Sequence, residues 1–376
     1  MNRTAITITT INVPKFLEGL CENINEHGHV DETTIIIIAD KKTPNDAEDY
    51  CIKTSQKYNV KLEYFDIAKQ LNEFKNNQQL LNLFPYNTPD RVMLGGMLSY
   101  MRGCERLIAV DDDNYSTEHD FVGFHQITGE TREIDIIDND YGWFNVHNAL
   151  IEENNIPFFP RGYPWSKRKN NANEKKLIKK SCKIVVNQGL VLEDPDIDAI
   201  SRLFWPIRAT GMADGYGTQF GLNKGVWSPF NYQNTSIIRD LIPCYYRPLS
   251  TLRNGDIWTA YVFNKLSDHF DDVLTFGQPL VKQLRNEHDL WDDLDIEYVN
   301  NKSTDLFIEV LRGIDIEGEK YFDLLGDLLN KAVEYINHLD NMPTVAHGGA
   351  SKEFEMVSLF FKEYLLWHKT VSELVK

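Results

Sequence analysis

The stretch Ile108-Ala-Val-Asp-Asp-Asp-Asn-Tyr115 joins an apolar run to three consecutive carboxylates, Asp111, Asp112 and Asp113. The run from Leu107 to Val110 has the length and residue types of a buried strand, so the acids are expected at the strand's carboxyl end, where open α/β sheets bind ligands. Neighbouring carboxylates repel one another unless a cation lies among them, and oxygen ligands suit a divalent metal that carries a diphosphate. A solvated acidic turn is the alternative, because the chain has 56 acidic and 39 basic residues.

Working outward, the preceding sequence alternates strand-like and helix-like segments. Three apolar runs, Ala5 to Ile11, Thr33 to Ala39 and Lys61 to Phe65, predict further strands of the same sheet. Pro14 opens a predicted helix that ends near Gly28, and Thr88 is the expected cap of another that runs to Gly103. The sequence therefore predicts an α/β fold.

The rest of the chain divides in two. From about residue 115 to 300 the pattern is irregular and rich in aromatic residues, Asn, Pro and Gly, which predicts loops that contact a substrate. Beyond residue 302 the apolar spacing is helical, so the predicted domains are 1–301 and a helical C-terminal subdomain, 302–376. The apolar faces of these helices comprise Tyr321, Leu324, Leu325, Leu328, Leu329, Phe354, Val357, Phe360, Phe361 and Leu365. We expect them to pack on the main domain or to support assembly of a homo-oligomer.

Composition narrows the classes of partner and compartment. A formal charge of −17 disfavours non-specific binding to nucleic acid or anionic lipid, because both are polyanions. The five cysteines form no Cys-x-x-Cys pair, which is typical of reduced thiols in a cytosolic protein. No apolar segment approaches the roughly 18 to 20 residues needed to span a bilayer. The expectation is a cytoplasmic protein without signal peptide or membrane span.

Two short polar segments end the first two strands and fit a nucleotide pocket. Thr9-Thr10-Ile11-Asn12 follows the first strand, and Ala39-Asp40-Lys41-Lys42-Thr43-Pro44 follows the second. A carboxylate after the second strand, such as Asp40, can accept the N3–H of uracil. The alternative is a polar strand exit of the kind that any α/β protein has.

Longer blocks resemble a known family. Three of them, in matching order and spacing, are similar to the STELLO-type glycosyltransferase-like domain: Thr9–Asn12 with Asp40–Pro44; Gln188–Leu190 with Asp194–Ala199 and Arg202-Leu203; and Gly225–Thr235 with Asp256–Trp258. A more distant likeness to the UDP-arabinopyranose mutases, or reversibly glycosylated polypeptides, comes from Asp111–Asp113 and Arg161–Pro164. Together the likeness covers roughly residues 4 to 295.

The resemblance implies a GT-A fold with a helical C-terminal extension. It implies a metal-dependent glycosyltransferase that uses a nucleotide sugar, with a UDP-sugar as the expected donor, Mn²⁺ or Mg²⁺ as cofactor and an unidentified hydroxyl acceptor. The alternatives are a UDP-sugar mutase, which needs no acceptor, and a non-catalytic GT-A scaffold that assists other glycosyltransferases. A sugar-nucleotide pyrophosphorylase is less consistent, because no glycine-rich phosphate loop follows the first strand.

The resemblance also implies roles for single residues on the donor side. The expected donor-binding residues are Thr9, Thr10, Ile11, Asp40, Lys42, Arg91, Asp111 and Asp112. Asp113 would bind the metal directly, and Asp111 would reach the ribose or a metal-bound water. His288 is the best-placed third metal ligand, with an exposed helical histidine as the alternative.

On the acceptor side, Asp256 is the expected carboxylate that hydrogen-bonds or deprotonates the attacking hydroxyl, and a helix cap is the alternative. In the mutases the arginine equivalent to Arg161 is the site of reversible self-glycosylation. Residues 161–180 are a basic stretch, expected either as a mobile loop that closes on the diphosphate or as a solvated loop.

Aromatic and amide side chains complete the expected sugar pocket. Flat rings that can stack on a sugar, although such residues more often belong to a core, are Trp143, Phe144, Trp165, Trp227, Phe230 and Trp258. The amides expected to recognise hydroxyl groups are Asn145, Gln188, Asn231, Gln233 and Asn234. Trp227 and these five amides are the predicted substrate-binding residues.

Overall fold

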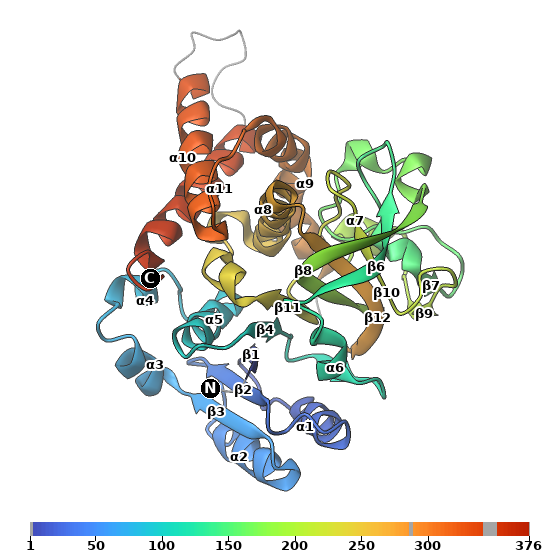
Figure 1. Cartoon of the computed structure of the whole chain (residues 1–376). Helices are drawn as coiled ribbons and strands as arrows, with labels where there is room; N and C mark the ends of the chain where they lie inside the picture. Colours follow the sequence, from blue (N-terminus) through green and yellow to red (C-terminus); the bar gives the residue numbers. More distant parts are fainter. Residues whose placement is uncertain (1–2, 286–288, 341–351, 376) are drawn as a thin grey trace.

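The chain forms one mixed β-sheet with helices on both faces and a cluster of helices at its C-terminal side (Figure 1). This computed structural model describes residues 3–285, 289–340 and 352–375. The strands are β1 Thr4–Thr10, β2 Thr33–Ala39, β3 Lys61–Phe65, β4 Arg106–Ala109, β5 Asn114–Ser116, β6 Thr131–Asp138, β7 Leu150–Glu152, β8 Lys176–Glu193, β9 Ala209–Met212, β10 Gln219–Leu222, β11 Thr235–Ile238 and β12 Val273–Gln283. The α-helices are α1 Leu17–Glu26, α2 Ala47–Tyr58, α3 Ile67–Glu73, α4 Gln78–Asn82, α5 Val92–Met101, α6 Phe121–His125, α7 Ala199–Phe204, α8 Gly255–Phe270, α9 Leu290–Gly313, α10 Tyr321–Asp340 and α11 Lys352–Val371.

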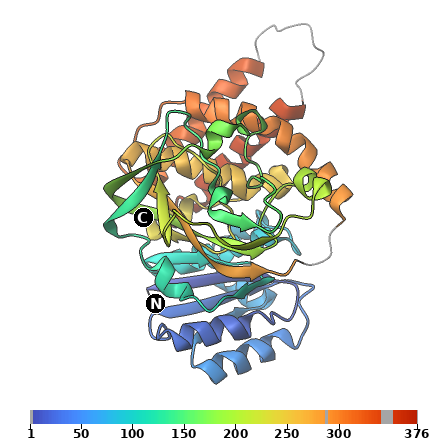
Figure 2. The ribbon, with the colours of Figure 1, turned by 90° about the vertical axis from the view of Figure 1, so that its right-hand side faces the viewer.

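The N-terminal part is a three-layer α/β unit. Ile35 and Ile37 of β2 belong to the apolar cluster that includes α1, whereas Ile36 and Ile38 belong to the cluster that includes α5. Figure 2 shows α1 and α2 below these strands and the rest of the molecule above them. Burial on both faces explains the four consecutive isoleucines, because only a strand covered by helices on each side tolerates such a run.

The order of the parallel strands places the acidic triplet. Strands β3, β2, β1 and β4 lie side by side in that order, so the chain moves outward from β1 to β3 and then returns to the other side of β1 as β4. The strand order therefore reverses between β1 and β4. In open α/β sheets the crevice beyond the carboxyl ends of the strands at such a reversal is the usual ligand site.

The region between residues 115 and 300, for which loops were expected, contains most of the second half of the sheet. The 18-residue strand β8 pairs through its first half with β6 and through its second half with β12 and β11. Strand β11 in turn runs antiparallel to β4. The expectation of irregular structure was wrong, because the polar and basic first half of β8 lacks the apolar pattern by which strands are recognised.

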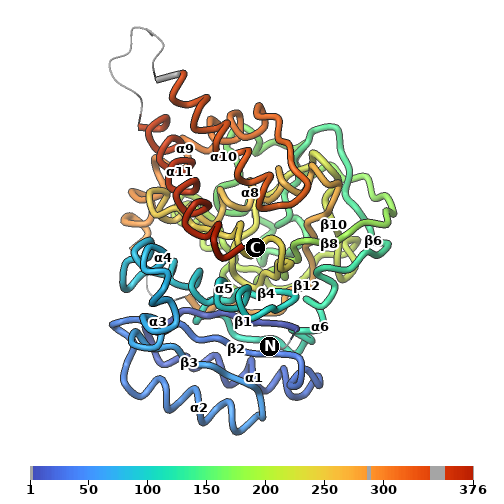
Figure 3. Tube along the Cα trace, turned by 60° about the vertical axis from the view of Figure 1, so that its left-hand side comes forward, coloured from blue at the N-terminus to red at the C-terminus, as the bar shows by residue number. Residues whose placement is uncertain are grey.

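The C-terminal helices share the core of the sheet domain. Trp367 of α11 stacks on Tyr246 and donates a hydrogen bond to the Pro243 carbonyl at 2.8 Å, and Trp258 of α8 stacks on Phe307 of α9. Figure 3 shows α11 beside α9 and reaching α4. The helix α9 continues through residues 301 and 302, so the predicted domain boundary falls inside an unbroken helix.

The apolar faces expected on α10 and α11 are covered within the chain. Leu324, Leu325, Leu328 and Leu329 are fully buried, as are Phe360 and Phe361. Packing on the main domain is therefore confirmed, and assembly into a homo-oligomer stays a prediction. The predicted fold class, α/β with a helical C-terminal extension, is confirmed.

All five cysteines are buried and free. In the described part of the chain no helix is long and apolar enough to cross a bilayer.

Candidate active site at the carboxyl ends of β1 and β4

The acidic triplet begins two residues after the end of β4 and is tied to the end of β1. The Thr10 hydroxyl donates a 2.6 Å hydrogen bond to Asp112 Oδ2, and Asn12 Nδ2 donates to the same oxygen at 3.5 Å. The middle acid is thus held by β1, as expected for a supporting residue. Asp111 and Asp113 lie on either side of it.

Asp113 is partly held by β12. Gln283 Nε2 donates a 3.1 Å hydrogen bond to Asp113 Oδ2, and the Leu284 amide donates to the Asp113 carbonyl at 3.1 Å. The other carboxylate oxygen, Oδ1, is buried, and no described residue donates a hydrogen bond to it. Burial raises the pKa of Asp113. A buried oxygen without a donor is costly, which indicates a missing cationic or donor partner.

Asp111 is exposed to solvent as a residue. Partial loss of water around its carboxylate, together with the negative charge of Asp113, raises the pKa of Asp111 to about 7. A divalent cation would offset the repulsion between the two acids.

The donor set fits Mn²⁺ or Mg²⁺, because both ions prefer carboxylate oxygens and complete their coordination with phosphate oxygens and water. No group of three or more His, Cys, Asp or Glu side chains in the described residues is arranged to hold a metal ion. The two acids would therefore depend on the ligand for the remaining coordination. His288, the predicted third protein ligand, lies outside the described residues.

The predicted nucleotide-base pocket is built around Asp40. Its Oδ1 accepts the Lys41 amide at 2.7 Å and its Oδ2 accepts the Asn87 amide at 2.6 Å, while Arg91 Nε lies 3.6 Å from Oδ2. The side chains of Asp40 and Arg91 are 1% and 2% exposed, so they stabilise this turn from inside. The uracil-binding role of Asp40 stays a prediction that requires this turn to open.

Thr9, Ile11 and Lys42 lie around the same strand ends. Thr9 Oγ1 donates to the Ile38 carbonyl at 3.1 Å, and the Lys42 amide donates to Asn87 Oδ1 at 3.0 Å. Ile11 and Lys42 expose their side chains. Thr43 bridges the strands, because its hydroxyl donates to the Thr10 carbonyl at 2.6 Å and accepts the Asp40 amide at 2.7 Å. The ends of β1, β2 and β4 thus form one continuous polar rim.

The second half of the site is a buried network centred on Arg161. Its guanidinium donates two 2.8 Å hydrogen bonds to Asp196 and two further bonds, at 3.3 and 3.0 Å, to Asp256 in the first turn of α8. Burial alone would lower the pKa of Arg161, but the two carboxylates outweigh it and raise the pKa well above its usual value. Asp256 is therefore an ion-pair partner and not the helix cap, a position that Asn254 occupies.

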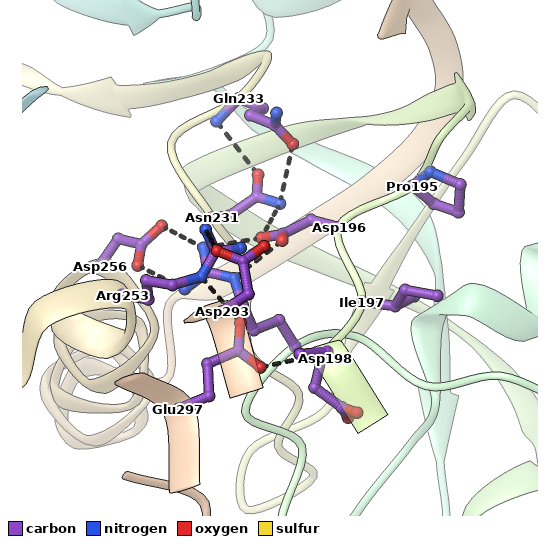
Figure 4. Close-up of polar contacts among 12 residues, drawn as sticks. Pro195, Asp196, Ile197, Asp198, Asn231, Gln233, Arg253, Asp256, Asp293 and Glu297 are labelled. Carbon is purple, nitrogen blue, oxygen red and sulfur yellow. Dashed lines mark hydrogen bonds and ion pairs between the residues drawn. The ribbon is translucent and has the colours of Figure 1, made fainter. Parts of the chain in front are cut away.

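One predicted amide, Asn231, contacts Asp196, and two others, Gln188 and Gln233, contact Asn231; Figure 4 shows Asn231 between Gln233 and Asp196. Asn231 Nδ2 donates to Asp196 Oδ2 at 2.9 Å, while Asn231 Oδ1 accepts Gln188 Nε2 at 2.8 Å. Burial alone would raise the pKa of Asp196, but Arg161 and the amide of Asn231 help to hold it below its usual value. The structure thus brings Gln188, Asn231 and Gln233 together with Arg161 and Asp256.

Arg247 connects the two halves of the site. Its Nε lies 3.2 Å from Asp90 Oδ1 without hydrogen-bond geometry, and the charges of Asp256 and Asp111 also act on it. Burial alone would lower the pKa of Arg247, but Asp90 and Asp256 raise it above its usual value. The charge of Arg247 therefore interacts with Asp111 and with Asp256.

Other predicted site residues are used elsewhere in the fold. Trp227 is 2% exposed, and its indole N–H donates a hydrogen bond to Asp268 Oδ2 at 2.7 Å. Asn234 Oδ1 forms a hydrogen bond with His125 Nε2 at 2.9 Å. Asn145 caps a short helical turn by accepting the His147 amide at 3.1 Å. The rings of Trp143, Phe144, Phe230 and Trp258 are core residues, whereas Trp165 is 41% exposed. Arg312 lies over the ring of Trp227 and Tyr261 stacks on it, and the substrate-binding role of Trp227 stays a prediction.

The basic stretch 161–180 is not a mobile loop over the diphosphate. Its second part forms the start of β8, where Lys179 pairs with Asp135 at 3.0 Å and Lys180 pairs with Asp271 at 2.6 Å. These lysines neutralise local acids.

Thr88, the expected cap of the helix before the triplet, instead donates to the Pro85 carbonyl at 3.2 Å and makes no capping hydrogen bond.

The sequence reasoning missed three residues of the site. Asp196 lies inside the block Asp194–Ala199, so the resemblance carried a signal for it. Gln283 and Arg247 stand in no motif, and only the pairing of distant strands and the turn before α8 bring them to the acids.

Comparisons with known proteins give structural likenesses only. No family model matches the chain and no curated protein matches it, so membership of the STELLO-type or mutase family is not shown. Similar solved structures include glucosyl-3-phosphoglycerate synthase from Mycobacterium tuberculosis with Mn²⁺ and UDP-glucose, at 12% identity and a TM-score of 0.38, covering 84% of this chain and 81% of that chain. They also include S. aureus TarS (residues 1–349), at 8% identity and a TM-score of 0.36, covering 99% and 92%.

Proposed function

We propose that the chain is a metal-dependent glycosyltransferase that transfers a sugar from a nucleotide sugar, with a UDP-sugar as the favoured donor, to a hydroxyl acceptor. The observation that carries the proposal is the pair Asp111 and Asp113 at the reversal of strand order between β1 and β4. Two acids that repel each other, one of them with a buried oxygen that lacks a donor, fit a divalent cation that carries a diphosphate.

On the donor side, Asp111 and Asp113 would hold Mn²⁺ or Mg²⁺, and Asp112 would keep the triplet fixed to β1. A bound divalent ion would offset the charge that builds on the diphosphate as its bond to the sugar breaks. Arg247 adds a positive charge that acts on Asp111. The neighbouring acids raise the pKa of Arg247, so its guanidinium stays protonated. The protein's own contribution is to present this charge in a fixed position before the reaction.

On the acceptor side, Arg161 holds Asp256 through both carboxylate oxygens. A carboxylate has about four acceptor positions, so Asp256 keeps capacity to accept a hydrogen bond from an acceptor hydroxyl. This arrangement supports a role in orienting the acceptor. The buried, doubly paired guanidinium of Arg161 does not support the self-glycosylation of the mutase alternative, because its nitrogens already donate to two carboxylates.

Incubation of the full chain with a UDP-sugar and Mn²⁺, with and without a panel of hydroxyl acceptors, tests the proposal. Chromatography should show release of UDP that increases when a suitable acceptor is present, and a glycosylated acceptor should appear by mass spectrometry. A new isomeric UDP-sugar from donor alone would instead establish the mutase activity. If the donor neither binds nor reacts with or without metal, the protein is a non-catalytic scaffold.

A further inference from the structure

A second pocket lies at the end of α8 opposite to Asp256. Its walls come from the last turns of α8 and α9 and from the connection between β10 and β11, and it is an open hollow of about 440 Å³. Helices α8 and α9 lie side by side (Figure 1), so the pocket is built on packed elements. Its volume is within the range of about 300 to 1,000 Å³ that is typical of small-molecule sites.

Arg312 is held rigidly at this pocket. Its guanidinium lies over the rings of Trp227 and Trp143, 4.2 and 4.8 Å from their centroids, and Nη2 donates to the carbonyls of Gly142 and Gly225 at 3.0 and 3.3 Å. Stacking on an indole and two carbonyl bonds fix the plane of the guanidinium in advance. The remaining N–H groups of the Arg312 guanidinium can donate hydrogen bonds to an oxyanion.

Two lysines join Arg312 at the pocket. Lys224 and Lys265 also line it, and the described part of the chain forms no ion pair with these lysines or with Arg312. Lys265 Nζ donates to the Arg312 carbonyl at 3.3 Å, which places the two cations together. Burial lowers the pKa of Lys265 and of Arg312. Three cations and two acids, Asp268 and Asp315, line the pocket, and the excess of positive charge in a chain of net charge −17 favours an anionic ligand.

The acids of the pocket do not remove this preference. Asp268 accepts the Trp227 indole at 2.7 Å and the Gly225 amide at 3.0 Å, so its oxygens are used to fix the pocket wall. Asp315 is the second acid that lines the pocket, so the lining contains two acids and three cations.

The pocket is separate from the acidic site. Asp256 and Asp268 lie twelve residues apart on α8, which corresponds to about 18 Å along the helix axis at about 1.5 Å per residue. A small anion cannot contact both ends of the helix. A small anion in this pocket therefore does not contact Asp256.

We propose that this pocket binds a small molecule that carries an oxyanion, either a phosphate group or a pair of carboxylates. Lys224 and Lys265 would supply charge, and Arg312 would supply paired N–H donors, which match the geometry of phosphate and carboxylate oxygens.

Isothermal titration of the full chain with inorganic phosphate and, separately, with citrate tests the proposal. Replacement of both lysines, Lys224→Ala with Lys265→Ala, should weaken binding by about tenfold or more, because each removes a charge-assisted contact. The exposed Lys75 lies outside the pocket lining, so Lys75→Ala is the matched control and should bind like the wild type. The stronger of the two titrants identifies the class of ligand.

The acidic site supplies the second control. Asp113→Ala removes the proposed metal ligand and should leave anion binding unchanged, so failure of the transferase proposal does not affect this test. Three results would overturn the inference: no binding of either anion to the wild type, equal binding by the double lysine variant, or loss of binding in Asp113→Ala.

Discussion

One guanidinium, that of Arg161, forms ion pairs with two buried carboxylates, Asp196 and Asp256. Replacing it by methionine should destabilise the protein by about 3 to 5 kcal/mol, because Asp196 and Asp256 would remain buried without a cation. Arg132, which pairs with Glu130 at 3.8 Å on the surface, is the matched control. Arg132→Met should cost less than about 1 kcal/mol. Urea unfolding measures both, and equal losses would contradict the structural role of Arg161.

A buried histidine gives the protein a predictable response to acid. Burial lowers the pKa of His125 from 6.5 to about 4, so the unfolded chain binds its proton more readily than the folded chain between these values. The free energy of unfolding therefore keeps its full contribution from neutral His125 above pH 6.5. This contribution falls by up to about 3 kcal/mol as the pH decreases toward 4.

The variant His125→Gln tests this origin. Its amide can replace hydrogen bonds to Asn234 and Ser236 but cannot titrate. Unfolding free energies measured from pH 8 to pH 4 should fall less steeply in the variant than in the wild type. Parallel curves would assign the acid response to other groups.

The acidic triplet could be identified as a candidate site from the sequence, whereas the residues that contact or act on these acids from distant elements could not. The sequence indicates Asp111, Asp112 and Asp113 as site candidates, because three acidic residues directly follow an apolar strand-like run. Arg247 and Gln283 act only after the chain has folded, since they reach the acids from elements more than a hundred residues away. A local pattern cannot encode such a contact.

At the scale of elements, helix α5 approaches strand β1 closely enough to require a glycine. A Cβ at Gly95 would overlap Thr7 Oγ1, whereas a Cβ at Gly19 in α1 would meet no atom within 4 Å. Gly95→Ala should therefore destabilise the protein by about 1 to 3 kcal/mol, and Gly19→Ala should stabilise it by about 0.5 to 1 kcal/mol through helix propensity. Thermal unfolding of the two variants measures the difference. A similar shift in both would show that α5 does not pack on β1 in this way.

Short strands that form one continuous segment between helices were predictable, and the strand along which the burial changes was missed. The segments Thr33–Ala39 and Lys61–Phe65 were predicted with the bounds that the structure shows. In β8, exposed lysines occupy the first half and buried residues the second half, because the strand leaves the sheet edge and enters its centre. Neither an alternating nor a continuous apolar pattern describes such a strand.

At the scale of the whole molecule, the C-terminal helices belong to the core of the sheet domain. A chain that ends near Asn301 would cut α9 and remove α10 and α11, which cover Pro243, Tyr246 and the helix α8. This truncation should prevent stable folding, seen as loss of the cooperative thermal transition and of solubility. A truncated chain that folds with the full chain's stability would restore the predicted boundary at residue 301. Light scattering on the full chain measures its oligomeric state independently.

The central claim is that Asp113 and Asp111 hold a divalent cation that carries the diphosphate of a nucleotide sugar. Thermal shift of the full chain with UDP-sugars tests it most directly, because a ligand at a hundred times its dissociation constant stabilises the folded state by about 2.7 kcal/mol. The account predicts stabilisation by a UDP-sugar in the presence of Mn²⁺, little without it, and none in a folded Asp113→Ala variant. Equal stabilisation of Asp113→Ala and the wild type would contradict it.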